Sequence, residues 1–144
     1  MRKLSMLIAI FLLFGGVLFA EGMWQDGTYT AEADQFSDNG WKNSVRVVVD
    51  NGYIIDAHFD AIPEEGDKMK YLQSVQGEYG MVANSNATDR WYVQVDRAAA
   101  YLLEEQDPGR IVRNSSGVDA ISGVSVTIMP HFELAQEALS GARR

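Results

Sequence analysis

The chain has 144 residues, of which 47% are apolar, so it has room for one domain with an ordinary packed core. Its net charge of −8 disfavours nucleic acid as a partner, because neutralising phosphates requires a basic face. The sequence contains no cysteine, which excludes disulfides, thiolate metal sites and thiol redox chemistry, so electron transfer would require a bound cofactor.

Residues 1–20 are predicted to be a signal peptide or an N-terminal anchor. A basic pair follows the first methionine, and residues 4–19 are nearly continuous apolar sequence. Ala20 is a candidate cleavage point, whereas an uncleaved run would associate the chain with a membrane through residues 4–19. The run is short against the roughly 20 residues of a spanning helix. Both alternatives predict an exported domain over residues 24–144, either in the periplasm or at the outer face of the cytoplasmic membrane.

The first part of this domain is predicted to form antiparallel strands. Asp26-Gly27 is typical of a turn before a short strand over residues 28–31. Two longer strands follow over residues 42–49 and 53–61. Asp50-Asn51-Gly52 lies between them, which predicts a hairpin.

The register of this hairpin depends on the length of its turn. A two-residue Asn-Gly turn would set Val47 opposite Asp56, which mixes apolar and charged side chains on one face. A three-residue loop with Gly52 in the left-handed conformation instead sets Val47 opposite Ile55 and gives one apolar side. The same register places Arg46 opposite Asp56, with opposite charges across the strands. The three-residue loop is therefore predicted.

The second part of the domain is predicted to be mostly helical. A short helix is indicated near residues 69–75, and Asp89 is a candidate N-cap for a helix over residues 90–105. The apolar stripe of the longer helix consists of Trp91, Val95, Ala98, Ala99 and Leu102. A short strand near 110–112 and a last helix over 128–141 follow. Strands followed by helices predict an α+β domain, with a mostly antiparallel sheet packed by two or three helices.

The most informative segment is Asp119-Ala120-Ile121-Ser122-Gly123-Val124-Ser125, directly before the last helix. It places a carboxylate, a glycine and a hydroxyl in fixed order on a loop, beside a helix N-terminus whose free N–H groups suit an anion. The segment resembles the flavinylation motif of the FMN-binding domain family, Asp-x-x-Ser/Thr-Gly-Ala-Thr, whose last hydroxyl carries FMN in phosphoester linkage. Ser125 aligns with the acceptor in place of Thr, and Val124 stands where the family has Ala.

Other segments extend the resemblance. Asp26-Gly27-Thr28-Tyr29-Thr30-Ala31 and Gly40-Trp41-Lys42 are similar to the opening of FMN-binding domains in bacterial extracytoplasmic electron-transfer proteins. Similar domains occur in the G and C subunits of the Rnf and sodium-pumping NADH:quinone reductase complexes. The resemblance implies an FMN-binding-domain-like fold, covalent FMN, and maturation by a FAD:protein FMN transferase. It further implies an electron carrier between a membrane redox donor and an extracytoplasmic acceptor, rather than an enzyme with its own substrate pocket.

The candidate cofactor-binding residues lie in and around this motif, and each has an alternative interpretation. They are Ser125, Ser122, Gly123, Val124, Asp119, Trp41 and Thr127. Ser125 is the acceptor or part of a turn that caps the last helix, while Thr127 is the alternative acceptor and the better N-cap candidate. Asp119 either orients the loop for the transferase or closes an Asx-type turn. Trp41 either flanks the flavin ring or belongs to the core.

Aromatic and histidine residues outside the motif have less specific interpretations. Trp91 is predicted to be a core residue, while Tyr71 and Tyr79 could cover the flavin. His58 and His131 lack the spacing of metal ligands, so no metal site is expected. Two functions of other classes stay open: a flavin-free surface or binding module that retains the fold, and a protein that binds or traffics flavin noncovalently.

Overall fold

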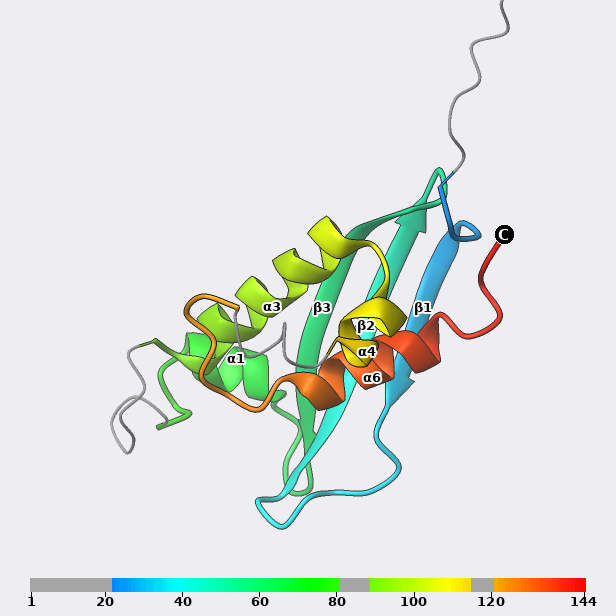
Figure 1. Cartoon of the computed structure of the whole chain (residues 1–144). Helices are drawn as coiled ribbons and strands as arrows, with labels where there is room; N and C mark the ends of the chain where they lie inside the picture. The colour runs from blue at the N-terminus through cyan, green and yellow to red at the C-terminus, as the bar shows by residue number, and fades with distance from the viewer. Residues whose placement is uncertain (1–21, 81–88, 115–120) are drawn as a thin grey trace, which may run out of the picture.

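The chain folds into one sheet covered by helices. The computed structural model describes residues 22–80, 89–114 and 121–144. The three strands, β1 (Gly27–Glu32), β2 (Trp41–Asp50) and β3 (Tyr53–Pro63), form an antiparallel sheet in the order β1-β2-β3. Figure 1 shows the helices on one face of this sheet, where α3 (Trp91–Glu105) packs against β3 and α6 (Met129–Ala138) packs against β2 and β1. The predicted α+β class with an antiparallel sheet is confirmed.

The turn between β2 and β3 contains two residues, Asn51 and Gly52, so the predicted three-residue loop is wrong. Asp50 pairs directly with Tyr53 across the turn. Both turn residues have positive φ, 50° for Asn51 and 80° for Gly52, as in the primed hairpin turns whose twist suits antiparallel strands. Gly52 is also required by packing, because a Cβ there would lie 2.6 Å from the Cα of Gly22.

A β-bulge in β3 restores the apolar register that the short turn alone would lose. The pairing skips Ile55, which is 53% exposed. This extra residue shifts the rest of β3 by one position, so Val47 pairs with Ala57 rather than with Asp56. Arg46 nevertheless forms the predicted ion pair with Asp56, at 3.2 Å between Nη2 and Oδ2.

The core lies between the inner face of the sheet and the apolar stripes of the helices. Its buried members include Val45, Val47, Val49, Ile54, Phe59, Trp91, Val95, Ala98, Leu102, Phe132, Ala135 and Leu139. Each large apolar side chain that is fully buried contributes roughly 1.5–3 kcal/mol. These contacts confirm the predicted stripe of the long helix and the predicted core position of Trp91, and they hold α3 and α6 on the sheet.

The helices near the predicted ranges form, but their caps differ from the predicted ones. Helix α1 (Lys70–Val75) matches the short predicted helix. Arg90 is the N-cap residue of α3 and makes no side-chain capping bond, so the predicted cap by Asp89 is wrong. The Asp89 carboxylate instead binds Arg97, at 2.5 Å between Oδ2 and Nη1. Helix α6 is shorter than predicted and has Ile128 as its N-cap residue, without a side-chain cap, so Thr127 is not the cap.

A helix replaces the strand predicted near residues 110–112. This helix, α4, spans Pro108–Arg113. Asp107 is its N-cap and accepts a hydrogen bond from the Arg110 N–H at 3.2 Å. Proline is favoured in the first turn of a helix, because its missing N–H has no intrahelical partner there. Asp-Pro therefore begins a second helix as well as following the first.

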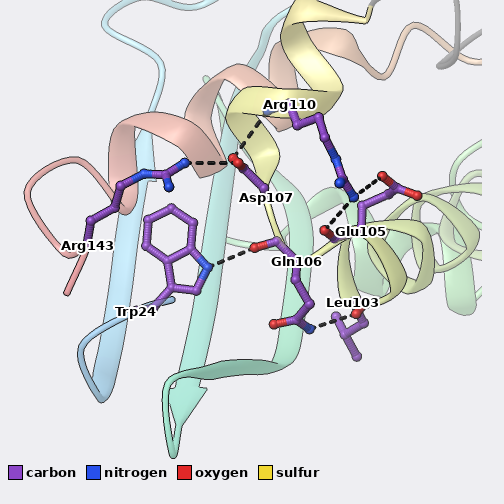
Figure 2. A network of polar contacts seen from close by, with 7 residues as sticks. All are labelled: Trp24, Leu103, Glu105, Gln106, Asp107, Arg110 and Arg143. Atoms are coloured by element: carbon purple, nitrogen blue, oxygen red, sulfur yellow. Dashed lines mark hydrogen bonds and ion pairs between the residues drawn. The ribbon is translucent and has the colours of Figure 1, made fainter. Parts of the chain in front are cut away.

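A network at one end of the sheet joins the two ends of the described domain (Figure 2). The Trp24 Nε1–H donates to the Gln106 carbonyl at 2.8 Å, and the Arg143 guanidinium lies 4.9 Å from the centre of the Trp24 ring. Arg143 also binds Asp107, at 2.9 Å. The Gln106 side chain donates to the Ile54 carbonyl and accepts from the Ile54 N–H, at 2.8 and 2.7 Å, so α3 is fixed to β3 beside the bulge.

Two sequence predictions fall on residues outside the described ranges. These are the leader or anchor over residues 1–20 and the motif residue Asp119. Within the described ranges, none of the helices has both the length and the apolar character needed to cross a membrane.

Candidate functional site

The loop before α6 presents Ser125 to solvent. A turn at Gly123, with φ of 77°, is closed by a hydrogen bond of 3.2 Å from the Val124 N–H to the Ile121 carbonyl. After this turn the side chains alternate, with Val124 and Val126 partly buried against the core and Ser125 exposed between them. The valine that departs from the family motif therefore packs inward, away from the exposed side of the loop.

A buried glutamine of α3 holds this loop in place. Gln94 is 1% exposed, and its Oε1 accepts from the Ser125 N–H at 2.7 Å and from the Val126 N–H at 3.1 Å. The same oxygen accepts from the Ser125 hydroxyl at 3.2 Å. The Gln94 Nε2 donates to the Asp89 carbonyl at 3.1 Å. One side chain thus fixes both the backbone at the predicted acceptor and the orientation of its hydroxyl.

Arg97 brings a positive charge to the same loop. Its Nη1 donates to the Gly123 carbonyl at 2.9 Å and to Asp89 Oδ2 at 2.5 Å. The positive φ favours glycine at position 123, and a Cβ there would lie 2.5 Å from this Nη1, so the Arg97 side chain would have to move. Arg97 therefore lies against the backbone two residues before Ser125.

The remaining motif residues have simpler environments. Ser122 and Thr127 are exposed on the same loop. Thr127 is followed by Ile128, which is 3% exposed and serves as the N-cap residue of α6. Residues 121–128 therefore offer three exposed hydroxyls, and of these the Ser125 hydroxyl is the one that Gln94 orients.

Trp41 lies in an aromatic pocket around a lysine. The Nζ of Lys70 lies 5.3, 4.6 and 4.7 Å from the ring centres of Trp41, Tyr79 and Trp91 respectively. Trp41 and Tyr79 meet edge to face, with ring centres 6.1 Å apart at 88°. Both are partly buried, whereas Lys70 is 8% exposed. We call these four residues the Lys70 pocket.

The ammonium of Lys70 is stabilised mainly by ring faces. Burial lowers the pKa of Lys70 to about 8, and the charge of Asp60 opposes this shift. Within the described ranges, no carboxylate forms an ion pair with Lys70. Cation–π contacts contribute roughly 0.5–2 kcal/mol each, which offsets part of the cost of burying the charge.

Asp60 brings the two histidines together, although they are far apart in the sequence. Its carboxylate accepts from the Ala61 and Tyr71 N–H groups at 2.7 and 2.9 Å and lies 3.2 Å from His58 Nε2. Its carbonyl oxygen lies 2.9 Å from His131 Nε2. A carbonyl only accepts, so His131 Nε2 carries the hydrogen and Nδ1 is the bare acceptor in the neutral ring. The buried Nδ1 has no hydrogen-bond partner among the described residues.

The Lys70 pocket and the acceptor loop are adjacent. Trp91 and Gln94 are three residues apart on α3, so their side chains share one helix face, with Cβ atoms about 5–6 Å apart. Trp91 also lies near His131, with ring centres 6.1 Å apart. His131 is in the first turn of α6, directly after the loop that holds Ser125. Two of the predicted site elements, Trp41 and the motif loop, are thus joined through α3.

The sequence interpretation did not include Gln94, Arg97 or Lys70. Gln94 lies within the apolar stripe, three residues after Trp91 and four before Ala98, and a glutamine at such a position indicates a buried polar contact. This signal was present in the sequence. Arg97 and Lys70 offered no comparable signal, because a lysine or arginine on a helix is usually exposed.

Comparison with known proteins places the chain in a family. A Clostridium thermocellum protein with a solution NMR structure is 37% identical, with a TM-score of 0.56, over 81% of this chain and 90% of that chain. This chain belongs to the family of that clostridial protein. A Clostridium perfringens protein of known crystal structure, 21% identical over 83% of this chain and 89% of its own, shares the fold with a TM-score of 0.59.

A further relative is a bacterial lipoprotein. The 15 kDa lipoprotein of Treponema pallidum (strain Nichols) is 27% identical over 119 residues, which are 83% of this chain and 77% of the lipoprotein. No family model matches the chain. The family relationship thus rests on the 37% identical Clostridium thermocellum protein.

Replacing Gln94 by leucine is expected to lower the free energy of unfolding by about 2–4 kcal/mol. The substitution keeps the volume but leaves the Ser125 and Val126 N–H groups without their acceptor, and an unmade buried hydrogen bond costs roughly 1–3 kcal/mol. Urea unfolding measures the change. Gln136→Leu on the exposed side of α6 is the control and is expected to stay within about 0.5 kcal/mol. A loss as small as that of the control would show that Gln94 does not hold the loop.

Acidification is expected to destabilise the domain through His131. Burial lowers its pKa to about 4, the hydrogen bond to the Asp60 carbonyl opposes this shift, and the charge of Lys70 adds to it. The unfolded chain, with a histidine pKa of about 6.5, therefore binds the proton first as the pH falls. The contribution of neutral His131 to the free energy of unfolding is fully present above about pH 6.5 and is lost as the pH falls towards about 4. Between about pH 7 and pH 5 this loss amounts to about 2 kcal/mol.

The measurement is urea unfolding at several pH values, with His131→Gln as the comparison. The variant lacks the titrating ring, so its stability is expected to fall less over the same range. Equal losses in the two chains would show that other groups cause the acid destabilisation.

Proposed function

We propose that this protein is an extracytoplasmic flavoprotein electron carrier, with FMN joined through its phosphate to the Ser125 hydroxyl. The observation that carries the proposal is the exposed Ser125 on a loop with the flavinylation motif, oriented by Gln94 and adjacent to an aromatic pocket. The fold class supports the resemblance, because a small α+β domain is what the resemblance implies.

The surroundings of Ser125 fit a phosphate group. A phosphodiester carries a negative charge, and the Arg97 guanidinium lies on the same loop, bound to the Gly123 carbonyl. The N-terminus of α6, which favours anions, begins four residues after Ser125. Arg97 would balance the phosphate charge, and its present partner Asp89 would share the guanidinium.

Attachment would change the contact between Ser125 and Gln94. The FAD:protein FMN transferase would join Oγ to the phosphorus of the FMN half of FAD, release AMP and remove the hydroxyl proton. The esterified oxygen could no longer donate to Gln94 Oε1, which lies 3.2 Å away. Two acceptor oxygens repel at that distance, so Oγ would turn away from Gln94 towards solvent. The Ser125 and Val126 N–H groups would keep their bonds to Gln94.

The aromatic residues of the Lys70 pocket fit a flavin ring. Trp41 and Tyr79 are partly exposed, and planar heterocycles stack on such faces. FMN, when bound, supplies the redox chemistry, because flavins exchange one or two electrons. The role of the chain is to hold the ring and to provide charge and hydrogen bonds around it.

The proposed location is outside the cytoplasm. The basic start and apolar run of residues 1–20 are typical of export, and a 27% identical relative is a lipoprotein. The partners would be a membrane redox donor and an extracytoplasmic acceptor. The acidic charge of −8 favours a partner with a basic face.

Co-production with an active FAD:protein FMN transferase tests the proposal. The expected result is a yellow exported protein whose colour stays with the chain after denaturation and gel filtration. Colour that separates from the denatured chain would support a noncovalent flavin protein instead. A colourless chain, in cells where the transferase modifies another acceptor domain, would support the flavin-free module.

A further inference from the structure

Lys70 in the pocket and His131 beside it each have a side-chain nitrogen that forms no hydrogen bond with the described residues. The Lys70 ammonium is 8% exposed and contacts ring faces, and no hydrogen bond from its Nζ is formed within the described ranges. His131, which is 2% exposed, has the bare Nδ1 acceptor. Buried polar groups are normally hydrogen-bonded, so the buried His131 Nδ1 calls for a donor, and the Lys70 ammonium near the same indole ring offers a donor to a ligand.

We infer that the Lys70 pocket binds the imide edge of the flavin ring, with Lys70 donating to a ring carbonyl and His131 Nδ1 accepting from the ring N3–H. The inference rests on the proposed function, because the FMN attached to Ser125 would supply the ring. It assigns to Lys70 and His131 a contact that the acceptor motif does not include.

The chemistry of the imide edge matches these two groups. This edge presents a carbonyl, an N–H and a second carbonyl in one plane. An ammonium can only donate and the bare Nδ1 can only accept, so together they complement one carbonyl and the N–H. The three aromatic rings around Lys70 provide apolar walls for a planar ligand.

The position of the pocket suits a ring attached at Ser125. Ser125 is bound to Gln94, and Trp91 lies one turn away on the same face of α3. Trp91 lies near both residues, with its ring centre 4.7 Å from Lys70 Nζ and 6.1 Å from the His131 ring centre.

The test uses free flavins and the Ser125→Ala chain, so that it does not depend on covalent attachment. Riboflavin and 3-methylriboflavin are titrated separately while tryptophan emission is recorded. Riboflavin is expected to bind and to quench the emission. The 3-methyl analogue, which lacks the N3–H, is expected to bind about tenfold more weakly, since loss of one buried hydrogen bond is worth about 1.4 kcal/mol.

Two lysine variants complete the test. Lys70→Met is expected to weaken riboflavin binding about tenfold, by loss of the charged donor. Lys68→Met is the matched control and is expected to bind like the parent, because Lys68 is partly exposed and pairs with Glu78 rather than with the aromatic rings. If Lys70→Met does not fold, the comparison of riboflavin with 3-methylriboflavin on the parent chain tests the inference.

Three results would overturn the inference: no riboflavin binding, equal binding of the two flavins, or equal binding by Lys70→Met and the parent. None of these depends on the adduct at Ser125. If FMN is attached to Ser125 but the expected binding pattern is not observed, the proposed function is supported and the flavin ring does not bind in the Lys70 pocket.

Discussion

Ser125→Ala is expected to abolish covalent FMN while leaving the domain folded. The substitution removes the acceptor oxygen but keeps the backbone bonds from the Ser125 and Val126 N–H groups to Gln94, at 2.7 and 3.1 Å. Only the longer hydroxyl contact to Gln94 is lost, so the free energy of unfolding is expected to change by less than about 1 kcal/mol. Flavin fluorescence on a denaturing gel, after treatment with active transferase, measures the adduct.

Neighbouring variants separate the acceptor from its surroundings. Thr127→Ala is expected to keep the adduct and to have little effect on stability, because Thr127 makes no capping bond to α6. Ser125→Thr keeps the hydroxyl and is expected to be modified. Val124→Ala restores the small residue of the family motif and is expected to label at least as fast. An adduct that survives Ser125→Ala and disappears in Thr127→Ala would make Thr127 the acceptor.

Trp24→Ala is expected to lower the free energy of unfolding by about 3–5 kcal/mol, the usual cost of removing a large buried ring. Trp24 is 3% exposed and belongs to the core. Its Nε1–H binds the Gln106 carbonyl, and the Arg143 guanidinium covers its ring (Figure 2). The substitution would therefore weaken the junction between the segment before β1, the end of α3 and the segment after α6.

Urea unfolding of the exported chain measures this effect. Trp24→Phe separates the contribution of the apolar contact from that of the hydrogen bond. The phenylalanine keeps much of the apolar contact but leaves the Gln106 carbonyl without its donor, so a loss of roughly 1–3 kcal/mol is expected. Met23→Ala is the control, because Met23 is the exposed neighbour in the chain. A Trp24→Ala loss no larger than that of Met23→Ala would show that the network does not stabilise the domain.

The hairpin illustrates how far the sequence determines the fold. Alternation of apolar residues predicted both strands and the buried face of β2, because a period of two places alternate side chains on one side of a sheet. At the start of β3 the predicted face is wrong, since Tyr53 and Ile55 are exposed and Ile54 is buried. It did not predict the bulge at Ile55. A bulge allows the preferred two-residue Asn-Gly turn and the apolar register together, and the sequence alone presented these as conflicting.

Helix ends were harder to predict than helix stripes. Asp89 and Thr127 both have cap-forming side chains, yet neither caps its helix. Asp89 binds Arg97 instead, a contact between residues eight positions apart that local preference does not contain. Asp107-Pro108 follows α3 and also begins α4, so the same residues serve two helices.

The candidate site likewise has a part that depends on local sequence and a part that depends on long-range packing. Its local part, the motif loop with Ser125, could be recognised because the functional order of residues is contiguous. Its long-range part, Gln94 on α3 and Lys70 on α1, depends on which helix faces pack together. His131 and Asp60 meet for the same reason, since α6 packs across the sheet.

Covalent FMN at Ser125 can be tested by measuring the intact mass of the exported protein, produced with and without an active FAD:protein FMN transferase. With the transferase, the mass is expected to increase by one FMN less one water, and fragmentation is expected to locate the addition on the Ser125 side chain. An unchanged mass, under conditions in which the same transferase fully modifies another acceptor domain, would contradict covalent attachment at Ser125.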